Sequence, residues 1–170
     1  MSNIFFYITA LAYLLSTLGY LAYLFLRKDY LLSIGRNLVV GGFAAHTITV
    51  VGRSFEAGRT PATGLHESLT LFSWTTVAIY MVLLFRYRQK VLGAFVTPFA
   101  FLLVITASFL PKEIVPLAPV LESWWLPVHV MLALLGNGFF ALAFFLSIMY
   151  VIQERYLKKR KLKGLFFILP

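Results

Sequence analysis

Three histidines carry the side chains of this sequence that are best suited to chemistry: His46, His66 and His129. A neutral imidazole is a good ligand for iron or zinc, and it can carry a proton near neutral pH. The sequence has no cysteine, which excludes disulfides, thiolate catalysis, iron–sulfur clusters and cysteine zinc sites within the chain. The three histidines are therefore the candidates to bind a metal or a cofactor. For His46 and His66, a hydrogen bond to a neighbouring helix is the alternative interpretation.

Scarce polar residues gather in one stretch, residues 56–74, with the sequence EAGRTPATGLHESLTLFSW. Its glycines and proline predict a turn, and Glu67 falls in the first turn of the helix that follows, where the helix dipole favours a carboxylate. That structural role is sufficient to explain Glu67. A functional alternative is an entrance between two helices, where Arg53 and Arg59 attract a carboxylate or a phosphate. Both interpretations stay open at this point.

The elements that must position these residues are membrane-spanning helices. Hydrophobic residues make up 61% of the 170, the mean hydropathy is +0.87, and only 12% of residues are charged, against about 25% in a soluble domain. A helix needs about 20 apolar residues to cross the hydrocarbon core of a bilayer. The sequence therefore predicts a single transmembrane domain over residues 1–170, an all-α polytopic bundle in the lipid bilayer. Its five predicted transmembrane helices are residues 4–26, 31–51, 68–85, 91–110 and 126–152.

The basic residues predict how this bundle is oriented. The net charge of +9 lies at the ends of the apolar segments, which argues against binding to nucleic acid. Twelve of the fifteen Lys and Arg residues fall on one side of the predicted spans. Lys and Arg favour the cytoplasmic side, so the N-terminus is predicted outside and the C-terminus in the cytoplasm. All three histidines then lie toward the outer face.

Two predicted helices carry small or polar faces, which favour contact with protein over contact with lipid. In the fifth span, His129 shares a face with Ala133 and Gly136, which predicts that His129 points into a close helix contact or a cavity. In the second span, one face consists of Gly35, Val39, Gly42, His46, Thr49 and Arg53.

Two segments resemble cytochrome c-type biogenesis proteins of the CcsA/ResC family. That family has a Gly-x-x-Pro turn followed by an aromatic-Glu-Ser motif and an apolar helix, and the similar segment here is GRTPATGLHESLTLFSW. The family also has a span that begins with a histidine and ends in a basic segment, which looks like ESWWLPVHVMLALLGNGFFALAFFLSIMYVIQERYLKKRK. The resemblance covers roughly residues 35–163. His66 stands where the family usually has tyrosine. A tryptophan-rich external loop normally follows a segment like GLFFILP, so the resemblance implies the N-terminal part of a longer protein.

The resemblance implies a role in cytochrome c assembly. Haem would be delivered to or held at the extracytoplasmic face for covalent attachment to apocytochrome c. His129 matches an external axial ligand of non-covalent haem b, with Trp124 and Trp125 as an apolar wall beside the porphyrin. Metal binding would therefore be through haem iron only, with the second ligand coming from the absent part. His46 and His66 remain lesser candidates.

The same resemblance implies partners and a location. The partners are a ResB/CcsB-type membrane protein, apocytochrome c, and thiol reductants supplied by other proteins. No catalytic residue is assigned, and the chain would be at most a component of a holocytochrome c synthase, or haem lyase, complex. The predicted location is a bacterial cell membrane, or the thylakoid membrane in a plastid.

Two other functions stay open. One is a HemX-type membrane protein that affects tetrapyrrole synthesis through partner binding. The other is a transporter subunit in which His46 and Arg36 line a polar pathway between helices.

Overall fold

Five helices make up the protein in the computed structural model, which describes residues 2–58, 64–87, 89–113, 123 and 125–158. This confirms the predicted all-α class and the number of helices, and each helix overlaps one predicted span. The helices are α1 (Ser2–Leu26), α2 (Asp29–Ala57), α3 (Leu65–Tyr87), α4 (Gly93–Ser108) and α5 (Trp125–Lys158).

Within the described residues, four helices are long and apolar enough to cross a membrane: α1, α2, α3 and α5. The fourth predicted span covered residues 91–110, but α4 has only 16 residues. By length and composition, these four helices are candidate membrane spans. The number of crossings and the orientation of the chain stay predictions.

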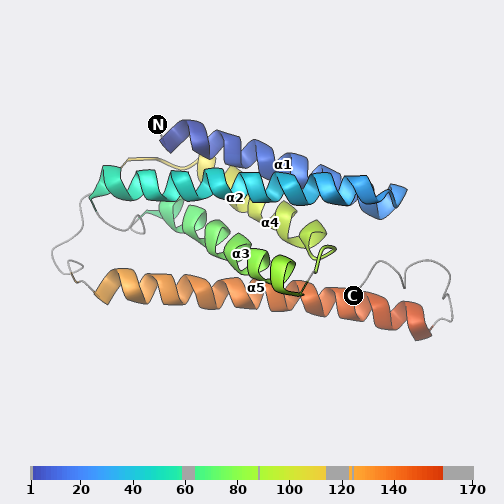
Figure 1. Ribbon diagram of the computed structural model, residues 1–170. Helices are drawn as coiled ribbons and strands as arrows, with labels where there is room; N and C mark the ends of the chain where they lie inside the picture. Colours follow the sequence, from blue (N-terminus) through green and yellow to red (C-terminus); the bar gives the residue numbers. More distant parts are fainter. Residues whose placement is uncertain (1, 59–63, 88, 114–122, 124, 159–170) are drawn as a thin grey trace.

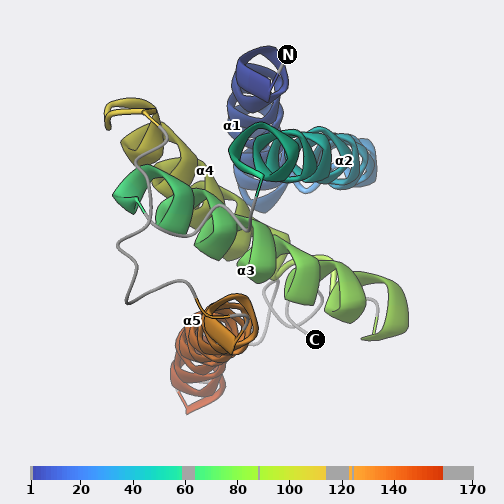
Figure 2. The same cartoon turned by 90° about the vertical axis from the view of Figure 1, so that its left-hand side faces the viewer.

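The helices alternate in direction, so that α1, α3 and α5 begin at the end where α2 and α4 finish (Figure 1). We call this the N-terminal end of the molecule. An α1–α2 hairpin lies on one side of the α3–α4 pair, and α5 lies on the other side (Figure 2). The N-terminal end therefore gathers the starts of three helices and the ends of two.

The α1–α2 hairpin is tight because small residues let the two backbones approach. A Cβ added to Gly19 would lie 3.2 Å from the Cα of Gly35, and one added to Gly42 would lie 2.9 Å from ring carbons of Tyr13. The hydroxyl of Ser16 donates a hydrogen bond of 2.7 Å to the carbonyl of Gly35. The small face predicted for the second span is therefore confirmed as a protein contact, and every member from Gly35 to Thr49 is buried.

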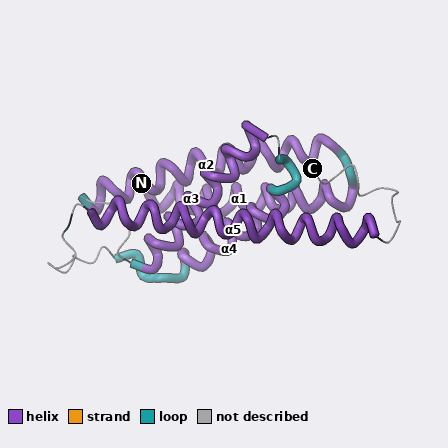
Figure 3. The backbone as a smooth tube through the Cα atoms, turned by 90° about the horizontal axis from the view of Figure 1, so that it is seen from below, coloured by secondary structure: helices purple, strands orange, loops and turns teal. Residues whose placement is uncertain are grey.

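Helix α3 is central and α5 is peripheral. In the apolar 18-residue stretch that makes each helix a candidate span, 56% of the residues of α3 are buried, against 11% of the residues of α5. In Figure 3, which views the molecule from below, α5 lies in front of the other helices, and it packs chiefly against α3. At this contact, a Cβ on Gly138 would lie 2.8 Å from the Cδ1 of Ile79.

The face predicted to carry His129 into a helix contact is not the packed face of α5. His129 and Ala133 are exposed, and a Cβ on Gly136 would meet nothing within 4 Å. The packed face instead contains Gly138, Leu142 and Met149, which are buried. That prediction is wrong. Small residues occur on both faces of α5, and α3 packs against the face with Gly138, not the face with His129.

Candidate functional site

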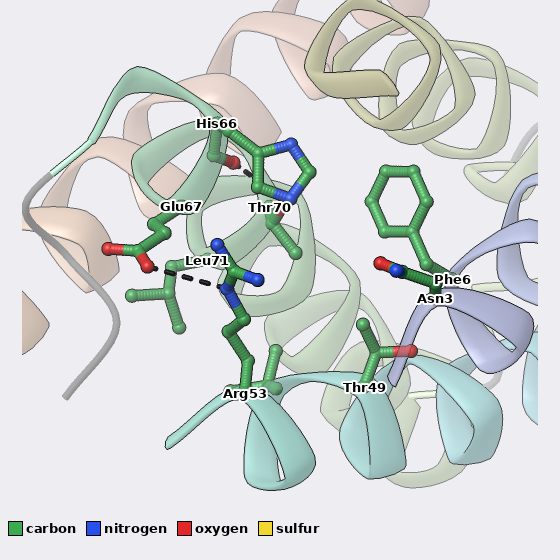
Figure 4. Close-up of a pocket in the computed structure, with 9 residues that line it drawn as sticks. Asn3, Phe6, Thr49, Arg53, His66, Glu67, Thr70 and Leu71 are labelled. Carbon is green, nitrogen blue, oxygen red and sulfur yellow. Dashed lines mark hydrogen bonds and ion pairs between the residues drawn. The ribbon is translucent and has the colours of Figure 1, made fainter. Parts of the chain in front are cut away.

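A polar pocket opens at the N-terminal end, between the start of α1, the end of α2 and the start of α3 (Figure 4). Its empty space is about 360 Å³, counting the part that is open to the outside. It corresponds to the entrance that the polar stretch predicted, although α1 also forms a wall. The lining residues are Asn3, Phe6, Thr49, Val50, Arg53, His66, Glu67, Thr70 and Leu71.

Arg53 is the central cation of this pocket. Helix α2 extends six residues beyond its predicted end at residue 51, and this extension carries the guanidinium toward α3. Its Nε lies 3.5 Å from the Oε1 of Glu67, whose side chain is only 5% exposed. It also donates a hydrogen bond to the backbone carbonyl of Lys112, just beyond α4. Arg53 therefore ties α2 to α3 and to the chain that follows α4.

His66 is held in one orientation by α4. Its Nδ1 lies 2.7 Å from the carbonyl oxygen of Ala107, and a carbonyl can only accept a hydrogen bond. Nδ1 therefore carries the proton, and Nε2 of the neutral ring carries a lone pair. The ring of Phe6 lies 5.3 Å away, centroid to centroid. Nε2 points into the space between Arg53 and Asn3 (Figure 4).

Lys112 is a second cation near this pocket: it does not line the pocket itself, but it contacts the lining residue Phe6. Its ammonium lies 5.3 Å from the ring centroid of Phe6 and 4.7 Å from that of Tyr7, and it donates to the hydroxyl of Tyr7 at 3.0 Å. Among the described residues, no carboxylate lies within 4.0 Å of this ammonium. Sequence reasoning did not select Lys112, because it lies more than 100 residues from the α1 residues it contacts.

His46 is a buried residue of the α1–α2 interface. Its Nδ1 lies 3.1 Å from the hydroxyl of Tyr13, and its Nε2 is buried without a hydrogen-bond partner among the described residues. Arg36, its partner in the transporter hypothesis, hydrogen-bonds Asn37 on the same helix. The structure therefore gives these two residues separate contacts.

His129 lies near the start of α5, one turn after Trp125, which is 60% exposed. No hydrogen bond joins the His129 ring to another described residue. The three histidines do not form a common metal site. In the described part of the chain, no group of three His, Cys, Asp or Glu side chains could hold a metal ion. Trp124, Arg59 and the segment GLFFILP lie outside the described residues.

Known proteins match this chain over long stretches. CcsA, a cytochrome c biogenesis protein of Trieres chinensis, is 33% identical over 104 residues, which is 59% of this chain and 33% of that protein. CcsA of Guillardia theta is 29% identical over 166 residues, 94% of this chain and 55% of that protein. HemX of Brevibacillus brevis is 30% identical over 145 residues, 85% of this chain and 53% of that protein.

The chain thus covers between one third and about half of the length of these curated relatives. The family described as Cytochrome C assembly protein matches residues 62–168, a range that contains His66, Glu67, Lys112 and His129. Since that match extends over more than half of the sequence, the chain belongs to the cytochrome C assembly protein family.

Proposed function

We propose that this protein holds haem for cytochrome c assembly, with the imidazole of His129 as an axial ligand of the iron. The observation that carries the proposal is the exposure of His129 on a long helix, within the part of the chain that matches the family. His46 and His66 are both buried, and each uses Nδ1 in a contact with the protein. Of the three histidines, His129 has the ring that a large planar ligand can approach without unpacking the bundle.

The surroundings of His129 suit a porphyrin. Trp125 lies one turn earlier on the same face, and Val128 and Leu132 are exposed beside it, so that apolar surface flanks the imidazole. An axial ligand must be held in position, and α5 provides a regular helical backbone for it. Trp124 would extend the apolar wall.

Bound haem would supply the group to which the thiols of apocytochrome c become attached. This chain has no cysteine, so those thiols and their reductants belong to other proteins. The role of its own residues is to bind and orient: His129 holds the iron, and Trp125 limits the tilt of the ring. We assign no catalytic residue to this chain, which would act as one component of a holocytochrome c synthase.

The proposed setting is the extracytoplasmic side of a bacterial cell membrane, or of a thylakoid membrane. Support comes from the basic residues Arg27, Lys28, Arg86 and Lys90, which lie at the end opposite to the start of α5. A ResB/CcsB-type membrane protein is the proposed partner, because the relatives from Trieres chinensis and Guillardia theta are CcsA proteins.

Haem titration of the purified full chain in detergent tests the proposal. Wild-type protein should shift and sharpen the Soret band of added haem. His129→Ala should lose most of this change, and added imidazole should restore part of it, because free imidazole can replace the missing ligand. Tyr150→Ala, a change at an exposed position near the other end of α5, is the control and should behave like wild type.

The same variants can be scored for maturation of a c-type cytochrome by haem staining of cell extracts. An identical Soret response in wild type and His129→Ala, together with unchanged cytochrome maturation, would reject His129 as the ligand. Equal losses in His129→Ala and Tyr150→Ala would also contradict the assignment, since they would indicate damage to α5 instead of a lost iron bond.

A HemX-type role is the second candidate, because the match to HemX of Brevibacillus brevis covers 85% of this chain. In that case the protein would influence tetrapyrrole synthesis through a partner. The expected result would be an altered level of tetrapyrrole precursors in cells that lack the protein, with normal attachment of haem to apocytochrome c.

A further inference from the structure

We propose that α5 pairs in the membrane with α5 of a second copy of this chain, through a face that it turns away from α3. Five exposed residues define this face, which we call the open seam of α5: Ala133, Asn137, Phe140, Phe144 and Ser147. The pairing goes beyond the proposed binding of haem, and it is measured without haem.

Asn137 is a polar residue in the middle of an apolar helix. It lies 12 residues after Trp125, the first residue of α5, which is about 18 Å along the helix axis. With Trp125 at the membrane interface, this position is near the centre of a hydrocarbon core of about 30 Å. The Asn137 side chain is exposed, and among the described residues none is hydrogen-bonded to its amide.

Two other exposed polar residues of the candidate spans show the contrast, because each has a partner within its own helix. Ser147, on the same seam, donates a hydrogen bond of 2.8 Å to the carbonyl of Ala143. The side-chain oxygen of Asn37, on α2, accepts a hydrogen bond of 3.3 Å from Arg36. An amide without a partner is costly in hydrocarbon, since lipid tails neither donate nor accept hydrogen bonds. Asn137 therefore requires a polar partner at its own depth in the bilayer.

A second copy of the chain supplies that partner by symmetry. Two copies of one chain insert in the same orientation, so their Asn137 side chains lie at the same depth. A carboxamide has both a carbonyl acceptor and N–H donors, so that two such groups can exchange two hydrogen bonds. Two lysines or two carboxylates in the same place would repel each other. Twofold symmetry is also the commonest arrangement of identical chains.

The spacing and size of the seam residues suit two parallel helices. Successive members of the open seam are separated by 4, 3, 4 and 3 residues, which is the repeat of helices that pack along a common axis. At Gly136, beside Asn137, an added Cβ would meet nothing within 4 Å. Gly136 and Ala133 thus let two backbones approach closely. A single asparagine in such a repeat fixes the register and the number of paired helices.

The described part of the bundle leaves the open seam uncovered. Helix α5 packs chiefly against α3, and the face that does so contains Gly138 and Leu142. In Figure 2 the other four helices all lie to one side of α5. The pairing therefore requires no rearrangement of the contacts between α5 and α3.

Sedimentation equilibrium of the purified full chain in density-matched detergent, without haem, measures the pairing. Wild type should show a reversible equilibrium between monomer and dimer. Asn137→Leu should raise the dissociation constant about tenfold, the effect of losing two hydrogen bonds between membrane helices. Asn137→Gln keeps the carboxamide and should raise it much less. Asn37→Leu removes an exposed amide from α2 and is the control, which should match wild type.

Cysteine crosslinking in membranes locates the contact, because the chain has no cysteine of its own. Under mild oxidation, Phe140→Cys should form a disulfide-linked dimer faster than Phe139→Cys, which is turned about 100° around the helix from it. The two positions are a matched pair, since both side chains are exposed, at 76% and 60%, and they are adjacent in depth. Ala133→Cys should also crosslink to its own copy, as parallel helices require.

Three results would each overturn the proposal: a monomer at every concentration, the same dissociation constant for wild type and Asn137→Leu, or equal crosslinking of Phe139→Cys and Phe140→Cys. Crosslinking of Phe140→Cys to a different polypeptide in place of its own copy would also overturn it, and would assign the seam to another membrane protein. The Soret titration of His129→Ala is a separate measurement, so the pairing and the haem site can fail independently.

Discussion

His66 Nδ1 lies 2.7 Å from the carbonyl oxygen of Ala107, so that the start of α3 is joined to the last turn of α4. This contact fixes which ring nitrogen bears the proton, because the carbonyl offers no proton of its own. Histidines that bind metals or ligands commonly use a backbone carbonyl in this way to orient the ring. The contact is therefore the reason that the pocket presents an acceptor at His66.

Nitrogen NMR of the histidine rings can test this tautomer. In protein labelled with ¹⁵N-histidine, the resonances of His66 should show a protonated Nδ1 and an unprotonated Nε2 at neutral pH. The resonances are assigned with His46→Phe and His129→Ala, which each remove one of the other two rings. A protonated Nε2 on a neutral His66 would contradict the hydrogen bond from Nδ1 to the carbonyl of Ala107.

A methyl group at position 42 should destabilise the α1–α2 hairpin. A Cβ there would lie 2.9 Å from two ring carbons of Tyr13 and 3.0 Å from the Cβ of Ala12, and overpacking of this kind costs about 1–3 kcal/mol. Gly42→Ala should therefore lower the thermal midpoint in detergent. Gly41→Ala is the neighbouring control: a Cβ there meets nothing within 4 Å, and it should be neutral or slightly stabilising because alanine favours helix.

Loss of the Tyr13 hydroxyl should weaken the same interface. Tyr13→Phe leaves the Nδ1 of His46 buried without its partner at 3.1 Å, which should cost about 1–2 kcal/mol in the free energy of unfolding. Tyr30→Phe, at a position that is 56% exposed, should have little effect. In a double-mutant cycle with His46→Phe, the two losses should be less than additive, and full additivity would show that the hydrogen bond contributes nothing.

The orientation can be tested with single cysteines, because the chain has none of its own. A membrane-impermeant maleimide should label Ser123→Cys in intact cells and should label Lys158→Cys only after the membrane is permeabilised. The two sites flank α5 at opposite ends, so each serves as the control for the other. The reverse pattern would put His129 on the cytoplasmic side and remove the proposed haem site from the extracytoplasmic face.

Much of the fold could be predicted because apolar length and the placement of small residues are local properties. The buried face of α2 follows from residues such as Gly35 and Gly42, which recur at helical spacing on one side. The end of α2 was predicted too early, because Arg53 and Glu56 end the apolar run while the helix continues to the left-handed Gly58.

The site was only partly predictable, since it depends on contacts between distant residues. The polar stretch pointed to Arg53 and Glu67, and these two side chains do meet. The roles of Phe6 and Lys112 depend on how α1 and the end of α4 approach each other, which no local pattern encodes. For α5, the helical spacing identified a face with small residues, but the face that packs against α3 is the one with Gly138, which lies against Ile79.

The shortness of α4 has a consequence for the surrounding lipid. With 16 residues and a rise of 1.5 Å per residue, α4 extends about 24 Å, roughly 6 Å less than the hydrocarbon thickness of a bilayer. A crossing at α4 requires the bilayer to become thinner beside it, or the flanking Lys90 and Lys112 to reach toward the surface. The membrane would then dip next to the pocket, which would bring the phosphates of neighbouring lipids to the depth of Lys112.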